Sequence, residues 1–555
     1  MEIIILLFAT TALFSIIGYG TFFNNIFLDK KNALNLGLIG FLGLFFLSSI
    51  SYFTHFFLPH DFIHNIVLII IGVTLFIYYK NIGNILIKRN YFYIILFLLI
   101  GIFIGKSHDD FGYYHLPNAL HFSYNKLEFG LGNLNHGFKH HSSIFYLYSV
   151  FYLPVIKFYL FNIINFFFLL FSILYFVDKI DDDTKNYKVT KLTFIKLLFC
   201  ILFISIFNRI GEYGTDITGQ ILAGVLIYLT IEAITKKIFK SNDIFLILIL
   251  LAYLITIKTY FIVYILFPLL IFLLKISKIK DLKNLFFSKT FIFITFVGLM
   301  FISINISATG CVIYPIKSLC FPNIFEWGLS ENNISYMSNW YEIWSKAGAG
   351  PDFRESDPLV YIDGFNWVEN WVDKYFFNKV SDFLLSILFC MLVVFIIFYK
   401  NIKIKLSLNR NILYLLFIIF LLFGIWFYNF PSLRYGGYIL ILSILIIIFA
   451  SIFNINNKQF TQIRKKLIIT ILLSFAVFIT KNSIRIKKEF NYIAIENFKS
   501  FPLFYVKDVA YEEIYLNNEK IYKVKGMCWS TPSPCLRNIN KTIKKSYGYK
   551  IYINK

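Results

Sequence analysis

Long apolar runs separated by short polar turns repeat along the whole chain. At a rise of about 1.5 Å per residue in a helix, each run is long enough to cross or nearly cross a bilayer. The stretch from Ile144 to Val177 is too long for one crossing and contains Pro154. We expect there a surface-lying amphipathic piece followed by one crossing. The pattern predicts an all-α polytopic membrane protein with about fourteen transmembrane helices, which begin near residues 2, 34, 64, 91, 144, 192, 215, 243, 260, 290, 383, 411, 435 and 466.

Polar segments divide this chain into a transmembrane part and a tail. The transmembrane part covers residues 1–481 and includes two large loops, at residues 108–143 and 308–382. The tail, residues 482–555, alternates short apolar and polar runs such as "EKIYKVKG" with turn residues. That alternation is typical of strands, so we expect a small strand-rich C-terminal unit.

Charge indicates which loops share a side of the membrane. Only 15% of the residues are charged and 58% are hydrophobic, whereas soluble domains carry about a quarter charged residues. The net charge of +22 comes largely from Lys and Arg in every second turn, which the positive-inside rule places in the cytoplasm. The charge therefore indicates no nucleic-acid partner. The loops at 108–143 and 308–382 and the tail fall on the opposite, outer side.

Four of the six cysteines form two close pairs in outer polar segments. Cys311 and Cys320 lie in the second large loop, and Cys528 and Cys535 lie in the tail. Close pairs of this kind predict two local disulfides and an oxidising compartment. Zinc binding is the weaker alternative because neither pair has the C-x₂₋₄-C spacing.

The first outer loop gathers ionisable side chains. Six of the nine histidines lie in residues 108–143, together with the adjacent carboxylates Asp109 and Asp110. Carboxylates and imidazoles on a loop between rigid spans are well placed to activate a nucleophile. The alternative is a solvated polar loop with incidental histidines.

Two histidines in this loop lie four residues apart. His136 and His140 are spaced as neighbours on a helix and could bind a metal or a substrate. Gly132, Gly137 and the lack of a clear helical pattern make the metal site the weaker reading.

Three isolated cations lie in short outer turns. They are Arg209 in "FNRIGEYGTD", Lys258 in "TIKTY" and Arg434 in "FPSLRYGG". Cations at membrane depth are costly unless they are paired or functional, so together they could hold a phosphate or pyrophosphate. The alternative is that each reaches lipid headgroups alone. Asp216 and Glu212 are expected to orient Arg209, and Tyr435 joins Arg434 as a candidate binding residue.

The second large loop is rich in tryptophan. An indole can stack on the apolar C–H face of a sugar ring, although anchoring at the membrane interface is the commoner role of such residues. The tryptophans are Trp327, Trp340, Trp344, Trp367 and Trp371.

Short motifs give the chain a resemblance to a known group of enzymes. The motifs "DFGYYHLPNAL", "GLGNLNHGF", "ATGCVIYP", "FPSLRYGG" and "CWSTPSPC" occur in this order over nearly the whole chain. They resemble bacterial membrane proteins that are similar to GT-C glycosyltransferases, relatives of protein mannosyltransferases and of the aminoarabinose transferase of lipid A. The resemblance implies a GT-C-like fold in a bacterial inner membrane, with the active site at the periplasmic face.

The resemblance also implies roles for particular residues. Asp110 occupies the position of the catalytic aspartate in the first large external loop, with Asp109 as the alternate, and Tyr114 and His115 would line the acceptor site. The donor would be a sugar on a polyprenyl phosphate, held through its phosphate by Lys258 and Arg434. The carboxylates are adjacent and do not form the D-x-D pattern of metal-dependent oligosaccharyl transferases, so no cofactor is expected. A divalent metal is the alternative.

These observations predict an inverting glycosyltransferase that moves a sugar from a polyprenyl-phosphate donor to a lipid or glycan acceptor among membrane lipids. One alternative is an O-antigen polymerase or ligase, which depends chiefly on Arg and His. Another is a transporter or flippase, which would place polar groups at the middle of the membrane. The spans have few charges at their centres, and the ionisable residues gather on one side, so surface chemistry is favoured.

Overall fold

The structure is a computed structural model of the chain. It describes residues 2–28, 34–105, 110–211, 214–276, 279–348, 357–404, 408–455, 460–490, 503–504, 506–537 and 541–554.

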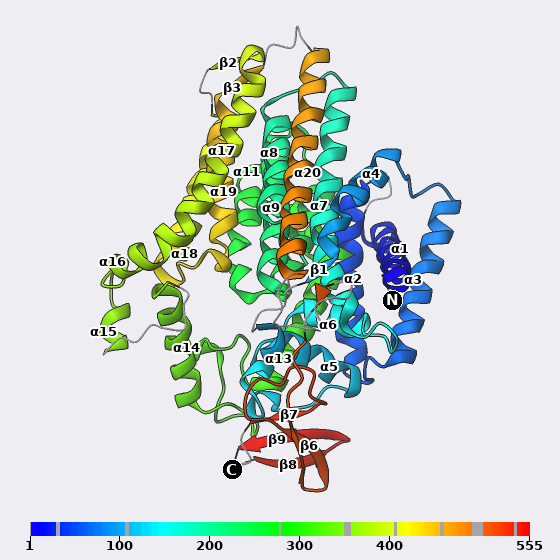
Figure 1. Ribbon diagram of the computed structural model, residues 1–555, viewed down its shortest axis with the longest axis vertical. Helices are drawn as coiled ribbons and strands as arrows, with labels where there is room; N and C mark the ends of the chain where they lie inside the picture. The colour runs from blue at the N-terminus through cyan, green and yellow to red at the C-terminus, as the bar shows by residue number, and fades with distance from the viewer. Residues whose placement is uncertain are drawn as a thin grey trace.

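Helices make up most of the molecule (Figure 1). Within the described ranges, nine helices are long and apolar enough to cross a membrane, and four shorter apolar helices accompany them. The chain is therefore a membrane-embedded helical protein, as the sequence predicts, while the count of fourteen crossings stays a prediction. The helices are α1 Glu2–Phe27, α2 Leu36–His55, α3 Phe62–Asn81, α4 Arg89–Leu98, α5 Leu116–Tyr124, α6 Ser143–Val150, α7 Phe161–Lys185, α8 Lys191–Ile206, α9 Thr215–Thr235, α10 Ser241–Ile257, α11 Leu266–Lys275, α12 Ile279–Phe286, α13 Lys289–Thr309, α14 Glu331–Lys346, α15 Pro358–Ile362, α16 Val368–Trp371, α17 Ser381–Phe398, α18 Arg410–Asn429, α19 Gly437–Ile452 and α20 Phe460–Phe490.

One expectation about the membrane part is wrong. The first piece of the stretch 144–177 is a short helix, as expected, but it is not amphipathic, because every residue of α6 is buried. Its Tyr146 donates to or accepts from His55 at 3.0 Å and packs edge-on against Tyr52 of α2. This burial explains why α6 is apolar on every side, since such a helix is found inside a protein.

The lysine-rich turns meet at one end of the helices, which we call the basic end. Lys88 pairs with Asp178 at 2.9 Å, and Lys179 pairs with Glu232 at 3.1 Å. Lys275 donates to the main-chain oxygen of Lys236 at 2.8 Å. These contacts join the ends of α7, α9 and α11 and the turn before α4, so the alternation of charge along the sequence corresponds to a real end of the molecule.

The opposite end, which we call the site end, carries the C-terminal strands (Figure 1). Tyr549 in this unit donates to the main-chain oxygen of Phe56, just after α2, at 2.9 Å. The strand-rich tail that the sequence predicts is present, but α20 continues past residue 481 to Phe490. The strands are β5 Glu512–Leu516, β6 Glu519–Lys523 and β7 Cys535–Leu536 in one sheet, the hairpin β8 Lys541–Ser546 and β9 Tyr549–Asn554, and the short pairs β1 Ile104–Gly105 with β4 Leu503–Phe504 and β2 Ile402–Ile404 with β3 Phe453–Ile455.

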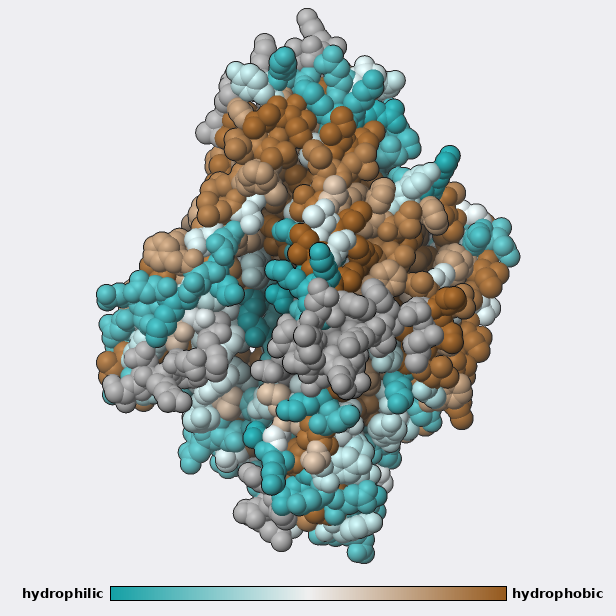
Figure 2. All heavy atoms as spheres, viewed as in Figure 1, coloured by the Kyte–Doolittle hydropathy of each residue, from teal (hydrophilic) through white to brown (hydrophobic). Residues whose placement is uncertain are grey.

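Surface hydropathy follows the same division. Figure 2 shows hydrophobic residues over the helical part of this face, with hydrophilic residues above it and over the strand-rich part below. A recess with hydrophilic walls opens near the middle of the face (Figure 2).

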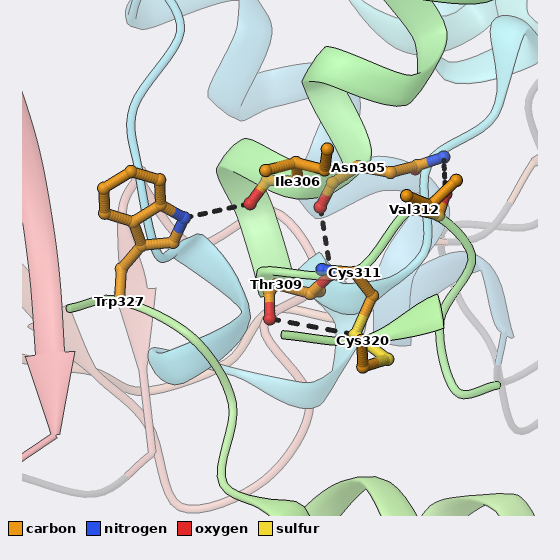
Figure 3. Close-up of a disulfide and its surroundings, with 7 residues drawn as sticks. All are labelled: Asn305, Ile306, Thr309, Cys311, Val312, Cys320 and Trp327. Carbon is orange, nitrogen blue, oxygen red and sulfur yellow. Dashed lines mark hydrogen bonds between the residues drawn. A yellow bond between two sulfur atoms is a disulfide. The ribbon is translucent and has the colours of Figure 1, made fainter. Parts of the chain in front are cut away.

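Both predicted disulfides are present, one of them in the second large loop and the other in the tail. Cys311 is bonded to Cys320 directly after α13 (Figure 3). The indole of Trp327 donates to the main-chain oxygen of Ile306 at 2.9 Å, and Asn305 donates to that of Val312 at 3.2 Å (Figure 3). The large loop is therefore fastened to the last turns of α13 at one point inside the disulfide-closed segment, Val312, and at one point after it, Trp327.

Candidate active site

Four charged side chains from four distant segments meet at the site end. The guanidinium of Arg434 donates through Nη2 to Asp110 Oδ2 at 2.5 Å and through Nε to Asp216 Oδ2 at 2.7 Å. The ammonium of Lys258 binds the other oxygen of Asp216. We call these residues the charge cluster. Their side chains are between 15% and 29% exposed, so each remains in contact with solvent.

The two acids of the charge cluster lie at the beginnings of helical segments. Asp110 immediately precedes Phe111–His115, which has the wide π-helical turn, and this turn continues into α5. Such turns are rare and occur frequently at functional sites. Asp216 lies in the first turn of α9, where the helix dipole favours a negative charge.

The two cations lie in irregular backbone. Lys258 is extended, between the end of α10 and a 3₁₀ turn that begins at Thr259. Arg434 lies in the 3₁₀ turn Leu433–Tyr435 between α18 and α19. The sequence here combines Pro431 with the glycines at 436 and 437, so neither helix can continue through it.

Side chains from three helical segments fix the turn that carries Arg434. Trp426 donates to the oxygen of Ser432 at 2.9 Å, and the hydroxyl of Tyr375 accepts from the amide of Leu433 at 2.9 Å. Gln220 of α9 donates to the main-chain oxygen of Arg434 at 3.4 Å and accepts from the amide of Ile439, at the start of α19, at 3.1 Å. The turn is thus held by its neighbours, and the guanidinium projects from a fixed base.

Gly436 cannot be replaced without moving this turn. Its φ is +97°, which residues with a side chain rarely adopt. A Cβ there would also lie 3.1 Å from the ring of Tyr260.

Aromatic rings cover the charge cluster. The guanidinium carbon of Arg434 lies 5.3 Å from the ring centroid of Trp344, and Lys258 Nζ lies 4.4 Å from that of Tyr435. Both are cation–π distances, which hold a cation in place without neutralising it. Burial acts to lower the pKa of Arg434, but the carboxylates of Asp216 and Asp110 raise it above its ordinary value. Arg434 is therefore always a cation.

Two of the predicted histidines form a second group close to the cluster. The hydroxyl of Tyr341 in α14 contacts His136 Nε2 at 3.0 Å and His140 Nε2 at 2.5 Å. Burial lowers the pKa of His136 to about 3 and that of His140 well below its ordinary value. Both imidazoles are neutral near pH 7. The ring of Tyr114 lies 5.9 Å from that of His140, so this group adjoins the turn that follows Asp110.

A family model described as "Domain of unknown function (DUF8201)" matches residues 1–441. The chain belongs to this DUF8201 family. The matched residues include the whole charge cluster and end before the C-terminal strands. No curated protein and no solved structure matches the chain.

The structure brings together most of the predicted site residues of this DUF8201 chain. His115 is buried, with its ring 4.4 Å from that of Tyr114 and 5.0 Å from that of Phe145. Arg209 is exposed in the turn after α8. Asp216 was expected to orient Arg209, but both of its oxygens bind Lys258 and Arg434 instead. Asp109 lies outside the described residues.

Several residues that contact the charge cluster or the histidines could not be placed there from the sequence. Trp344 was one of five candidate tryptophans, and nothing in the sequence tied it to Arg434. Gln220 could not be found from the sequence, because an amide in an apolar chain has many ordinary roles, and Tyr341 was indicated only by its tryptophan neighbours. The aromatic spacing of Trp340, Tyr341 and Trp344 on one helix was the single usable indication.

Among the described residues, no group of three or more His, Cys, Asp or Glu side chains could hold a metal ion. The predicted metal alternative at His136 and His140 also differs from the observed bonds, since both imidazoles contact Tyr341.

Proposed function

We propose that this protein is an inverting glycosyltransferase that moves a sugar from a polyprenyl-phosphate donor to a lipid or glycan acceptor. In this proposal the site end faces the periplasm of a bacterial inner membrane. The observation that carries the proposal is the meeting of Asp110, Asp216, Lys258 and Arg434 at one end of apolar helices. A carboxylate and two cations side by side suit a reaction that removes a proton and releases a phosphate.

In the proposed reaction, Asp110 accepts the proton of an acceptor hydroxyl. The hydroxyl oxygen forms a bond to the anomeric carbon while the bond from that carbon to the donor phosphate oxygen breaks. The electron pair of the broken bond stays on the departing lipid phosphate. Because attack and departure occur on opposite faces of the sugar, the anomeric configuration inverts.

The cations stabilise the charge that develops on the leaving phosphate. An arginine has five N–H donors, and the bonds within the charge cluster engage Nε and Nη2 of Arg434. Nη1 of Arg434 and the remaining hydrogens of Lys258 Nζ can then serve a phosphate oxygen. Asp216 holds the two cations next to each other, and Arg434 joins them to Asp110. A donor with a prenyl tail also explains why the site adjoins membrane helices.

Neutral polar and aromatic groups support an uncharged sugar or polyol on the acceptor side. Tyr341, His136 and His140 offer hydroxyl and imidazole groups without a formal charge at pH 7. Trp344 adds an apolar ring face next to Arg434. These are the groups with which proteins commonly bind sugars.

The test uses a deletion strain complemented with variants. Asp110→Asn should reduce transfer by about 100-fold or more, because it removes the proton acceptor. The matched control is Asp61→Asn, an exposed aspartate that caps α3 by accepting from the amide of His64 at 2.9 Å. Asparagine caps helices equally well, so this control should restore wild-type function.

The measurement is mass spectrometry of the cell's surface glycans and lipids, with protein levels checked by immunoblot. We expect one glycan species to disappear on deletion and to return with wild type and Asp61→Asn only. An unchanged glycan profile with a solute accumulating in the cytoplasm would reject the proposal in favour of transport. Full function of Asp110→Asn would favour a polymerase or ligase.

A further inference from the structure

The disulfide loop of the C-terminal unit packs directly against the turn that follows Asp110. This loop runs from Cys528 to Cys535 and is closed by the disulfide between them. Its amide at Trp529 donates to the main-chain oxygen of Gly112 at 2.8 Å. A segment more than 400 residues away in the sequence therefore touches the first turn after the proposed base.

Gly112 and the indole of Trp529 fit each other closely. A Cβ added at Gly112 would lie 2.2 Å from ring atoms of Trp529, closer than any real contact. The ring of Phe111 meets the same indole edge-on at 6.3 Å. Trp529 is only 7% exposed and packs into the core of the membrane helices. The indole thus packs directly against the turn Phe111–His115 at Phe111 and Gly112.

The loop is fastened to the His-rich segment at two further points. Asn135 donates to Cys528 Sγ at 2.9 Å, and His121 Nδ1 contacts Ser533 Oγ at 2.7 Å. His121 lies within α5, into which the turn continues, and Asn135 lies after α5. The position of Trp529 is therefore fixed relative to the segment that it supports.

The backbone at Trp529 is held in a conformation that such residues avoid. Its φ is 47°, in the left-handed region that favours glycine. Residues with a side chain adopt such conformations only when the surroundings impose them. The disulfide and the contacts to Gly112 and Asn135 supply those surroundings.

We propose that Trp529, held by the Cys528–Cys535 loop, is a positioning residue that sets the place of Asp110 relative to Arg434. The catalytic importance of that placement rests on the proposed function, whereas the mechanical role of Trp529 does not. Trp529 acts through the main chain at Gly112 and touches no reacting atom.

The first test measures amide hydrogen exchange on the full chain in lipid nanodiscs. Trp529→Ala should raise exchange at residues 111–115 at least about tenfold, and Trp529→Phe should restore most of the protection. The matched control is Trp327→Ala, which removes an equal side chain from the same end. Trp327 adjoins Gly130, so this control should loosen that region and leave residues 111–115 unchanged.

The second test exploits the close fit. Gly112→Ala should displace the turn in the wild-type background, because the new methyl group meets the indole. In the Trp529→Ala background the same substitution should have little further effect on exchange or on transfer. Such non-additivity identifies a direct contact, whereas two independent structural losses would add.

Outcomes for the two proposals can be told apart. Unchanged exchange at residues 111–115 in Trp529→Ala, or additive effects with Gly112→Ala, would overturn the positioning role whatever the enzyme does. The positioning role is supported if exchange rises as expected in Trp529→Ala and its transfer activity falls through a lower turnover number while the KM for the donor is unchanged. If the exchange results hold while Asp110→Asn keeps full transfer, the positioning role stands and the proposed function fails. If Trp529→Ala does not fold, Gly112→Ala alone carries the test, and unchanged exchange at residues 111–115 in that variant would overturn the positioning role.

Discussion

Two carboxylates at opposite ends of α9 each bridge two cations, yet their surroundings differ. Asp216 in the first turn binds Lys258 and Arg434, and Glu232 in the last turn binds Lys179 and Lys236. Both carboxylates are 15% exposed. Their chemistry is therefore nearly identical, and the difference lies in what holds their partners.

At the basic end one cation comes from regular helix and the other from the extended residue directly after a helix. Lys179 lies within α7, and Lys236 directly follows α9 and also pairs with Asp243 at 2.7 Å. At the site end both cations lie in irregular turns, and Arg434 also donates a hydrogen bond to Asp110. Irregular backbone needs more support from neighbouring side chains than a helix does. Both cations at the site end lie in such backbone, against one of the two at the basic end, and Arg434 also binds a second carboxylate, Asp110. This difference favours function at the site end and structure at the basic end.

The largest effect should come from removing one charge at each end. Asp216→Asn should lower transfer by about 100-fold or more, because Lys258 loses its partner and Arg434 is held on one side only. Glu232→Gln should leave transfer within about twofold and cost roughly 0–1 kcal/mol of stability, because Lys179 and Lys236 can turn to water. The measurement is transfer activity of the complemented strain beside the thermal midpoint of each purified variant. Equal losses of activity at both ends would erase the proposed distinction.

The sequence predicted the ends of the molecule better than its site. Apolar runs and alternating lysines give the helices and the basic end directly, because both follow from transfer into lipid. The site depends on contacts between residues far apart in sequence, such as Asp110 with Arg434, and a single sequence carries no distance between them. Asp216 shows the limit clearly, since its nearest cation in sequence is Arg209 and its partners are two later residues.

Acid provides a second way to separate the two ends. All nine histidines lie between residues 55 and 141, at or leading into the site end. Burial lowers the pKa of His121 and His136 to about 3 and that of His141 to about 4. Below pH 6.5 these histidines bind protons in the unfolded chain but stay neutral in the folded protein. The free energy of unfolding therefore falls as the pH drops from 6.5 toward 4.

One neighbouring group acts in the other direction. Burial raises the pKa of Glu128, which lies 3.3 Å from His121, so its protonation favours the folded state at low pH. Three histidines outweigh one carboxyl, at up to about 1.4 kcal/mol per pH unit for each. As the pH is lowered in steps from 7.5 to 5, protection from hydrogen exchange, corrected for the pH dependence of the intrinsic rate, should therefore fall first at residues 115–141 and later at the basic end. Simultaneous loosening of both ends would contradict this order.

The smallest effect should come from the ring beneath Arg434. Trp344→Leu should reduce transfer by about two- to fivefold, because a cation–π contact is worth about 0.5–1 kcal/mol at a partly exposed site. Trp344→Phe keeps a ring face and should retain most of the activity. The control at the basic end is Tyr93→Leu, which removes the ring 5.8 Å from Arg89 and should change nothing. A loss of transfer in Trp344→Leu as large as that in Asp216→Asn would mean that the indole contacts the substrate. Equal transfer activity of Trp344→Leu and Tyr93→Leu would mean that the aromatic ring contributes no more at the site end than at the basic end.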